Sequence, residues 1–232
     1  STLESLKPET VVIINPHGFR VQGVLSVSVA ERATAYWASD VKLDFEMDPT
    51  IANAIADKAT EMNVPVVKYI YGASSGPECF VPLDWGAVVP LYFMGHRFTP
   101  KPKIVHCSPM RTLPLATHYE FGRAIGRVLK ESDKRIAFIA SADQGHAHDA
   151  NGPYGYDPAS AKYDAWMQDV IRNGNLDELL NADPQLVEDG KPDSLWPTTV
   201  LAGILKENPM QAKLLSYEVN VYFGILCAEF TQ

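Results

Sequence analysis

The chain has 232 residues, of which 46% are hydrophobic, with a formal net charge of −8 and a sequence pI near 5.2. This length suits one large α/β domain with a sizeable core. The acidic balance argues against a nucleic-acid backbone or an anionic membrane as partner, because both require a basic face. We therefore predict a single domain over residues 1–232 without either partner, and leave open whether it forms a homo-oligomer.

The three cysteines, Cys79, Cys107 and Cys227, are widely separated and form no CxxC pair. This pattern indicates neither a disulfide framework nor a structural zinc knuckle, and it suits a reducing compartment. No apolar run approaches the roughly 18 residues that span a bilayer, and no signal peptide opens the sequence. The expected location is the cytoplasm.

The first half of the chain alternates strand-like and helix-like segments. A β-branched run over residues 10–14 stops at an Asn-Pro pair and predicts a buried parallel strand. Residues 51–62 predict a helix, because Asp48-Pro49 supply an N-cap and a first helical residue. Short apolar runs at residues 64–67 and 103–105 predict two further strands.

The second half continues this alternation. Residues 115–130 predict a helix with one apolar face, and residues 135–140 form an apolar run that we predict as an inner strand. Asp157-Pro158 opens another predicted helix, which stops at an Asn-Gly turn signal. Two late runs, 213–219 and 222–230, are typical of closing strands. The pattern predicts an α/β fold: a central mostly parallel or mixed sheet with helices on both faces.

Polar residues directly after apolar strands are the first functional candidates, since ligands bind beyond the carboxyl ends of the strands in open α/β sheets. His17 follows the strand over residues 10–14, and Gly18 lets the backbone approach a ligand closely. The competing interpretation is a loop histidine hydrogen-bonded to a neighbouring carbonyl. The residues alone favour that plainer interpretation.

A second polar loop follows the strand that ends at Ala140. Residues 141–149 pack two histidines, His146 and His148, and two aspartates into a short stretch. Such density at the end of a strand favours metal binding or acid–base chemistry over a loop that is merely ordered by its own hydrogen bonds. The spacing of the two histidines matches no zinc motif.

Glu218 lies inside the apolar run 214–219. A carboxylate in such a strand costs free energy unless it is paired or bound to metal, and the residues alone leave both open. His96 and His106 neighbour apolar runs and are predicted core histidines, whereas His118 is expected to be solvated. No GxSxG, P-loop or GxGxxG motif occurs, which argues against a serine hydrolase, an NTPase and a dinucleotide enzyme.

Four motifs occur in an order that resembles a known family: VVIINPHG, LDWGAVVPL, ASADQGH, and SYE followed by an apolar strand. Over about residues 10–230 the chain is similar to the catalytic (B) subunit type of the class III extradiol ring-cleavage dioxygenases. The resemblance implies a mononuclear non-haem Fe(II) held by two histidines and one carboxylate. Open positions on that metal would take O₂ and a catechol-like or aminophenol-like aromatic substrate.

Position by position, the resemblance implies that His17 is a metal ligand and Glu218 the carboxylate ligand. His146 matches the histidine that acts as acid and base near the bound oxygen, and we place His148 beside it in the substrate pocket. Trp85 stands where many members have a histidine that can contact substrate. We place Trp85 in the pocket too and expect a different substrate class, because an indole cannot exchange a proton.

The family's first ligand histidine lies in an upstream strand and loop that have no counterpart before residues 10–14. We therefore expect that the N-terminal strand and loop of the family's domain are missing from this sequence. The leading hypothesis is an Fe(II)-dependent extradiol dioxygenase. A non-catalytic binding or structural member of the family is the alternative that the missing ligand and Trp85 favour. A third hypothesis is a metalloprotein of the same fold that uses zinc.

Overall fold

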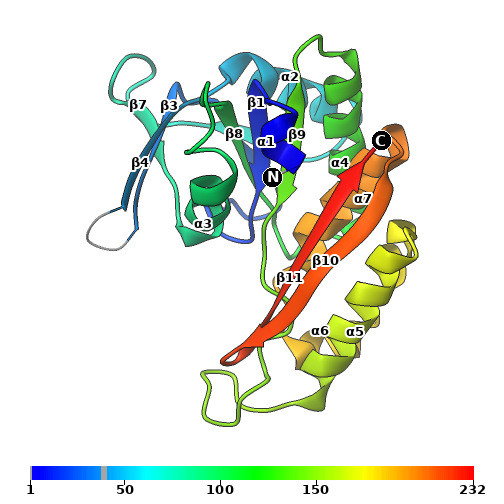
Figure 1. Ribbon diagram of the computed structural model, residues 1–232. Helices are drawn as coiled ribbons and strands as arrows, with labels where there is room; N and C mark the ends of the chain where they lie inside the picture. The colour runs from blue at the N-terminus through cyan, green and yellow to red at the C-terminus, as the bar shows by residue number, and fades with distance from the viewer. Residues whose placement is uncertain (1, 38–40) are drawn as a thin grey trace.

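The computed structural model describes residues 2–37 and 41–232 (Figure 1). Its main sheet has five strands in the order β5-β2-β8-β1-β9. Their bounds are Thr10–Ile14 for β1, Leu25–Ser28 for β2, Val66–Tyr69 for β5, Lys103–Ser108 for β8 and Ile136–Ala140 for β9. β1 runs parallel to β8 and β9, whereas β2 is antiparallel to β8. The sheet is mixed, and the predicted α/β fold is confirmed.

Three helices pack in one cluster with the first face of this sheet. They are α2 (Pro49–Glu61), α4 (Leu115–Glu131) and α7 (Leu195–Glu207). Val12 of β1 and Val105 of β8 point to this side, where they join Ile55 of α2 and Phe121 of α4 in one buried cluster. The helices form because each carries an apolar stripe that this sheet face can bury.

The opposite face is covered by α3 (Trp85–Met94) and by a second, four-stranded sheet. That sheet has the order β4-β3-β7-β6, with the bounds Val41–Glu46, Arg32–Trp37, Cys79–Pro82 and Tyr71–Gly72. Ile13 of β1 packs on this side with Phe45 of β4 and Leu91 of α3. The sequence prediction leaves this sheet out, although the alternation Val-Lys-Leu-Asp-Phe-Glu in β4 is a strand signal of period two.

The C-terminal strands form a separate hairpin. β10 (Gln211–Asn220) and β11 (Phe223–Thr231) make a two-stranded sheet, which lies beside α5 (Pro158–Arg172) in Figure 1. Leu214 and Leu226 pack with Tyr163 of α5 in a third buried cluster. The short elements η1 (Leu176–Asn181) and α6 (Pro184–Gly190) complete this part. The prediction that the late runs close the central sheet is wrong, because their apolar faces are buried against helices instead.

The position of β9 also differs from the prediction. Residues 135–140 were expected to form an inner strand, but β9 lies at the end of the five-stranded sheet, beside β1. Ile136 and Phe138 are accordingly half-buried. An apolar run reports that a strand packs between two layers, and it carries no information on how many strands flank it.

The first helix, α1 (Thr2–Ser5), is a single turn. Ser1 and residues 38–40, which the predicted domain includes, lie outside the described residues. Within the described part of the chain, no helix combines the length and the apolar character needed to cross a bilayer.

Glycines allow α4 and α7 to pack with their backbones in contact. A Cβ atom on Gly122 would lie 2.0 Å from the carbonyl oxygen of Val200, and one on Gly203 would lie 2.0 Å from that of Tyr119. Any larger residue would push the two helices apart, and interiors packed at this density do not adjust without cost.

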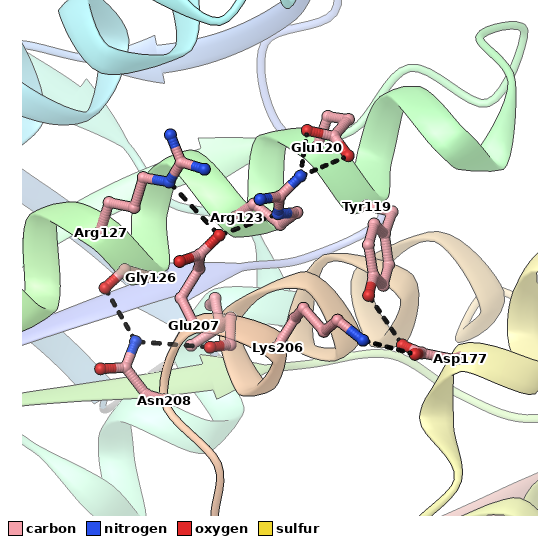
Figure 2. Close-up of polar contacts among 10 residues, drawn as sticks. Tyr119, Glu120, Arg123, Gly126, Arg127, Asp177, Lys206, Glu207 and Asn208 are labelled. Carbon is pink, nitrogen blue, oxygen red and sulfur yellow. Dashed lines mark hydrogen bonds and ion pairs between the residues drawn. The ribbon is translucent and has the colours of Figure 1, made fainter.

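Polar side chains fasten the same two helices at their solvent side (Figure 2). Glu207 of α7 accepts hydrogen bonds from Arg123 at 2.8 Å and from Arg127 at 3.3 Å. Directly after α7, Asn208 Nδ2 donates to the carbonyl of Gly126 at 2.8 Å. These partly exposed pairs each add little stability, so the glycine contact is the main determinant of how closely the helices approach.

We expect Gly122→Ala to lower the free energy of unfolding by about 3 kcal/mol, because the new methyl group meets the backbone of α7. In Gly126→Ala the methyl group would first meet the Glu207 Cβ at 3.0 Å. That variant should stay within about 1 kcal/mol of the wild type, since the gain in helix propensity offsets the mild crowding. Urea unfolding followed by circular dichroism measures both, and equal losses would contradict the proposed backbone contact.

Asp48 links the amino end of β1 to the first turn of α2. Its Oδ2 accepts from Thr10 Oγ1 at 2.8 Å and from Lys134 Nζ at 2.6 Å, and its Oδ1 accepts from the amide of Ile51 at 3.2 Å as the N-cap of α2. Burial alone would raise the pKa of Asp48, but these hydrogen bonds and the charge of Lys134 lower it below its usual value. The ionised carboxylate is therefore the form that stabilises the fold.

We expect Asp48→Asn to destabilise the protein at pH 7 by about 1 to 3 kcal/mol, because a charge-assisted hydrogen bond to Lys134 is lost while the cap acceptor remains. A depressed pKa stabilises the fold above the unfolded value of 3.8 and stops doing so as the pH falls through the folded value. The difference in free energy of unfolding between the wild type and Asp48→Asn should thus shrink below pH 4. Asp57→Asn, in the same helix and paired with Lys68 at the surface, is the control, and its effect should be small throughout.

Candidate functional site

His17 lies in the loop at the carboxyl end of β1, against the first residue of α3. The ring centroids of His17 and Trp85 are 4.5 Å apart and the rings are tilted by 49°. The Trp85 side chain is 60% exposed, so it covers His17 while keeping a free surface. Asp84 caps α3 by accepting a hydrogen bond from the amide of Gly86 at 2.8 Å. The structure thus brings together two candidate residues that are distant in the sequence.

A chain of hydrogen bonds supports the loop that carries His17. Asn15 Nδ2 donates to Asp84 Oδ1 at 2.6 Å, which leaves Asn15 Oδ1 to accept from His106 Nε2 at 2.8 Å. His106 Nδ1 then accepts from the Tyr69 hydroxyl at 3.0 Å. Burial lowers the pKa of His106 to about 4, so the ring is neutral at pH 7. His106 is a satisfied core histidine, as predicted, and it aligns the ends of three strands.

The backbone conformation and the packing at residue 18 both require a glycine. Its φ is +85°, and a Cβ atom there would lie 2.4 Å from Ser108 Oγ and 2.7 Å from His106 Cε1. From the sequence, this glycine is predicted to allow the close approach of a ligand. In the structure the close approach is to β8.

Two other histidines differ from their predictions. His118 is fully buried, with Nδ1 3.1 Å from the carbonyl oxygen of Pro114, and burial lowers its pKa to about 4. The expectation that it is solvated is wrong, because this turn of α4 faces the protein interior. His96 is half-buried and stacks on Tyr92 with centroids 6.1 Å apart.

The loop over residues 141–149 connects the central sheet to the C-terminal hairpin. At its start, the amide of Ser141 donates to Ile14 of β1 at 2.9 Å and its hydroxyl donates to the carbonyl of Gly86 at 2.5 Å. Farther on, the amide of Gln144 donates to Gly224 of β11 at 2.9 Å, and the amide of Gly224 donates to Gly145 at 3.0 Å. The loop therefore joins the end of the sheet where His17 lies to the strands that carry Glu218.

His146 is 7% exposed and has two different partners on its two ring nitrogens. Nδ1 lies 2.7 Å from the carbonyl oxygen of Lys191, and Nε2 lies 3.6 Å from Asp143 Oδ2. The rings of Tyr154, Tyr222 and Phe223 surround it, with centroids between 5.4 and 6.1 Å away. An imidazole with one nitrogen anchored and the other beside a carboxylate is suited to proton transfer.

His148 faces helix α5 rather than His146. Its Nε2 lies 2.9 Å from Oδ2 of Asp164, a residue that is 1% exposed. The same Oδ2 accepts from the Tyr217 hydroxyl at 2.6 Å, and Oδ1 accepts from the amide of Gly145 at 2.7 Å. Asp164 thus binds the polar loop, α5 and β10 together, and the predicted pocket residue His148 has its Nε2 engaged in that junction.

Glu218 is exposed and lies opposite Ile225 in the hairpin. Since side chains alternate along a strand, Glu218 projects to the face opposite its neighbour Tyr217, which reaches α5. Phe223 lies two residues before Ile225 and so shares the face of Glu218. The rings of Tyr222 and Phe223 are both 6.1 Å from that of His146, so His146 lies beside the turn of the hairpin that carries Glu218.

The described residues do not complete the implied metal site. Within residues 2–37 and 41–232, no group of three His, Cys, Asp or Glu side chains is placed to hold a metal ion. A facial triad needs two histidines and one carboxylate, and His17 and Glu218 would supply one of each. That His17 and Glu218 share a metal therefore stays a prediction.

Sequence reasoning missed Asp164, Asp193 and the carbonyl group of Lys191. Asp164 did leave a signal, because it falls on the buried face of α5 at helical spacing from Ser160 and Ile171. A carboxylate on an apolar helix face needs buried donors. No residue-level signal marks the Lys191 carbonyl, since it is a backbone group placed by the end of α6.

The sequence model of one protein family, described as the catalytic LigB subunit of aromatic ring-opening dioxygenase, matches residues 1–225. A curated relative, Protein CA_C1420 of Clostridium acetobutylicum, is 27% identical over 228 residues. That match covers 96% of this chain and 48% of the relative, so the chain spans about half the length of the curated protein.

Among solved structures, the uncharacterized protein JW3007 from Escherichia coli K12 has a similar fold. The crystal structure superimposes with a TM-score of 0.63 at 15% sequence identity, covering 98% of this chain and 90% of that one. At this identity the likeness concerns the fold alone.

We expect Asp164→Ala to lower the free energy of unfolding by about 3 kcal/mol, because it leaves the buried amide of Gly145 and the half-buried side chains of His148 and Tyr217 without their shared partner. Amide hydrogen exchange at Gly145 should also speed up, since its acceptor is removed. Asp169→Ala on the exposed face of α5, where the carboxylate pairs with Arg172, is the matched control and should change little. Similar behaviour of the two variants would refute the role of Asp164 as a junction.

Proposed function

This chain belongs to the family of catalytic LigB subunits of aromatic ring-opening dioxygenases, and from that membership we propose that it opens the ring of a catechol-like or aminophenol-like substrate with O₂ in an Fe(II)-dependent extradiol reaction. The observation that carries the proposal is the setting of His146. It is a buried histidine with Nε2 beside a carboxylate, walled by aromatic rings. It lies in the loop that joins the His17 end of the sheet to the Glu218 hairpin.

We assign His17 and Glu218 as the ligands that this part of the chain would supply. Iron, when bound, would hold O₂ and the substrate oxygens side by side. Because the described residues hold no group of three donors, the proposal requires one further ligand beside His17 and Glu218. Zinc is the alternative metal, since it accepts the same histidine and carboxylate donors.

His146 is the proposed acid–base residue. With Nδ1 bound to the Lys191 carbonyl, Nε2 is the nitrogen that would exchange a proton with the substrate. Trp85 has no proton to exchange, but its exposed indole beside His17 offers an apolar surface to an aromatic ring. His148 would contribute to the pocket by shape, because its Nε2 is bound to Asp164.

We further propose a small aromatic compound and O₂ as the partners, with no nucleic acid and no membrane, and the cytoplasm as the location. The net charge of −8 and the three free cysteines support this assignment. Exposed apolar side chains on the hairpin, among them Leu215, Val221 and Ile225, leave a homo-oligomer open.

A non-catalytic member of the same family is the second candidate function. Two observations favour it: the described residues hold no group of three metal donors, and Trp85 covers the candidate ligand His17. In that case the site would serve binding or assembly rather than oxygen chemistry.

Metal analysis of full-length protein prepared without oxygen separates these functions. Bound iron together with oxygen uptake on a catechol is the expected result and supports the dioxygenase. A protein that binds no metal supports the non-catalytic member. Zinc without oxygen uptake indicates a metalloprotein of the same fold, and either of these two outcomes overturns the leading proposal.

Two substitutions in the full-length protein test the assigned roles. We expect His146→Ala to reduce oxygen uptake by about 10²–10⁴-fold with iron content nearly unchanged, because an acid–base residue acts on turnover. Glu218→Ala should lose iron, because a ligand carboxylate offsets the charge of the metal. Iron content and oxygen uptake are measured on both variants.

Glu229→Ala is the control for Glu218→Ala, because it removes a carboxylate from the same hairpin that is paired with Lys213. It should retain both iron and activity. If His146→Ala is also empty of metal, His146 is a ligand and the division of roles is wrong.

A further inference from the structure

The carboxyl end of α6 fixes both the position and the tautomer of His146. The backbone amide of His146 donates to the carbonyl oxygen of Gly190 at 3.0 Å, and its Nδ1 lies 2.7 Å from that of Lys191. A carbonyl oxygen only accepts hydrogen bonds, so Nδ1 must carry a hydrogen and donate it. The nitrogen left for chemistry is therefore Nε2.

Lys191 presents its carbonyl because its backbone is left-handed, with φ 51° and ψ 44°. The amide of Lys191 donates to Val187 at 3.0 Å and ends α6, while Nζ lies 3.1 Å from the carbonyl oxygen of Glu188. The ammonium group is thus engaged with the end of its own helix. Lys191 contributes an acceptor to His146, and the positive charge is held at the helix end.

Asp143 is the carboxylate that faces Nε2. The distance of 3.6 Å from Asp143 Oδ2 to Nε2 is longer than a hydrogen bond but short enough for a strong charge interaction. A second carboxylate, Asp193, lies close by, since its amide donates to the carbonyl oxygen of Asp143 at 3.2 Å. Asp193 is already paired with Arg111, whereas among the described residues the ion-pair partner of Asp143 is His146.

The groups around His146 favour its protonated form. Burial lowers the pKa of His146, but Asp143, the Lys191 carbonyl and the charge of Asp193 together raise it above its usual value. Tyr154 and Tyr222 are the other titratable side chains that flank the ring. The nearby His148 is turned toward Asp164 and so does not compete for Asp143.

We propose that Asp143 is the positioning residue for His146: with Nδ1 held by Lys191, Asp143 keeps Nε2 oriented and protonated, and the proton on Nε2 is the one transferred. This inference rests on the proposed function in one respect, namely that His146 exchanges a proton with the substrate. In that step the Nε2–H bond breaks and an O–H bond forms on the accepting substrate oxygen. The imidazole is left neutral with Nδ1–H on Lys191, and Asp143 stays ionised throughout.

The test is a proton NMR titration of histidine rings in wild-type and Asp143→Asn full-length protein, without added metal. The His146 signal is identified by its loss in His146→Gln. We expect its midpoint to fall in Asp143→Asn, because the charged imidazole loses its facing carboxylate. In protein that takes up oxygen, the alkaline limb of the pH profile should move to lower pH as well, since the acid form of His146 is lost earlier. The KM should change less than kcat.

Asp149→Asn is the matched control from the same loop, where the carboxylate accepts from the amide of Asn151. Asp149→Asn should leave the midpoint of the His146 titration unchanged. Asp143→Glu, which keeps a carboxylate, should have a midpoint close to that of the wild type. An unchanged midpoint in a folded Asp143→Asn protein overturns the inference. A lowered midpoint in a protein that shows no oxygen uptake supports the positioning role and counts against the proposed function instead, so the two failures are distinguishable.

Discussion

The complete burial of β1 is the constraint on which the rest of the structure depends. Its residues Val11 to Ile14 are 0% exposed, with β8 and β9 hydrogen-bonded along its two edges. A strand without solvent contact must have both sheet faces covered. The helices α2, α4 and α7 cover one face, and α3 with the smaller sheet covers the other. Beyond its carboxyl end the chain can expose polar groups, and His17 follows there.

Two carboxylates, the half-buried Asp84 and the buried Asp164, organise the polar region beyond that end. Asp84 connects the cap of α3 to Asn15 and through it to His106, and Asp164 connects the loop of His146 to α5 and the hairpin. The hydrogen bonds that both oxygens of Asp164 accept compensate for its removal from water, whereas Asp84, among the described residues, accepts only through Oδ1. Asp143 has a side chain that is 41% exposed and faces Nε2 of His146, whereas the buried Asp164 binds its histidine together with the amide of Gly145 and the hydroxyl of Tyr217. The difference separates carboxylates that hold the fold from one that can act on a neighbour's proton.

The split between the two groups of candidate residues has a structural cause. His17 and Trp85 belong to the central sheet and its helix, whereas Glu218 belongs to a hairpin that makes its own ladder. The loop over residues 141–149 is hydrogen-bonded to both. Proton chemistry at His146 and any metal binding by His17 and Glu218 would therefore depend on how firmly this loop holds the hairpin against the sheet, and Asp164 is the residue that couples them.

The sequence by itself determined the α/β class, most helices and inner-layer strands, and the loops that carry His17 and His146, because periodicity and caps are local properties of the chain. It could not determine that β9 lies at the sheet's end or that residues 211–231 form a separate hairpin. The apolar pattern of a strand is the same whichever strand pairs with it. Tertiary structure alone decided that His148 turns to Asp164, that His118 is buried, and that Nδ1 of His146 rests on the Lys191 carbonyl. Those outcomes depend on contacts between residues distant in the chain, and the last involves a backbone group that no side-chain pattern can reveal.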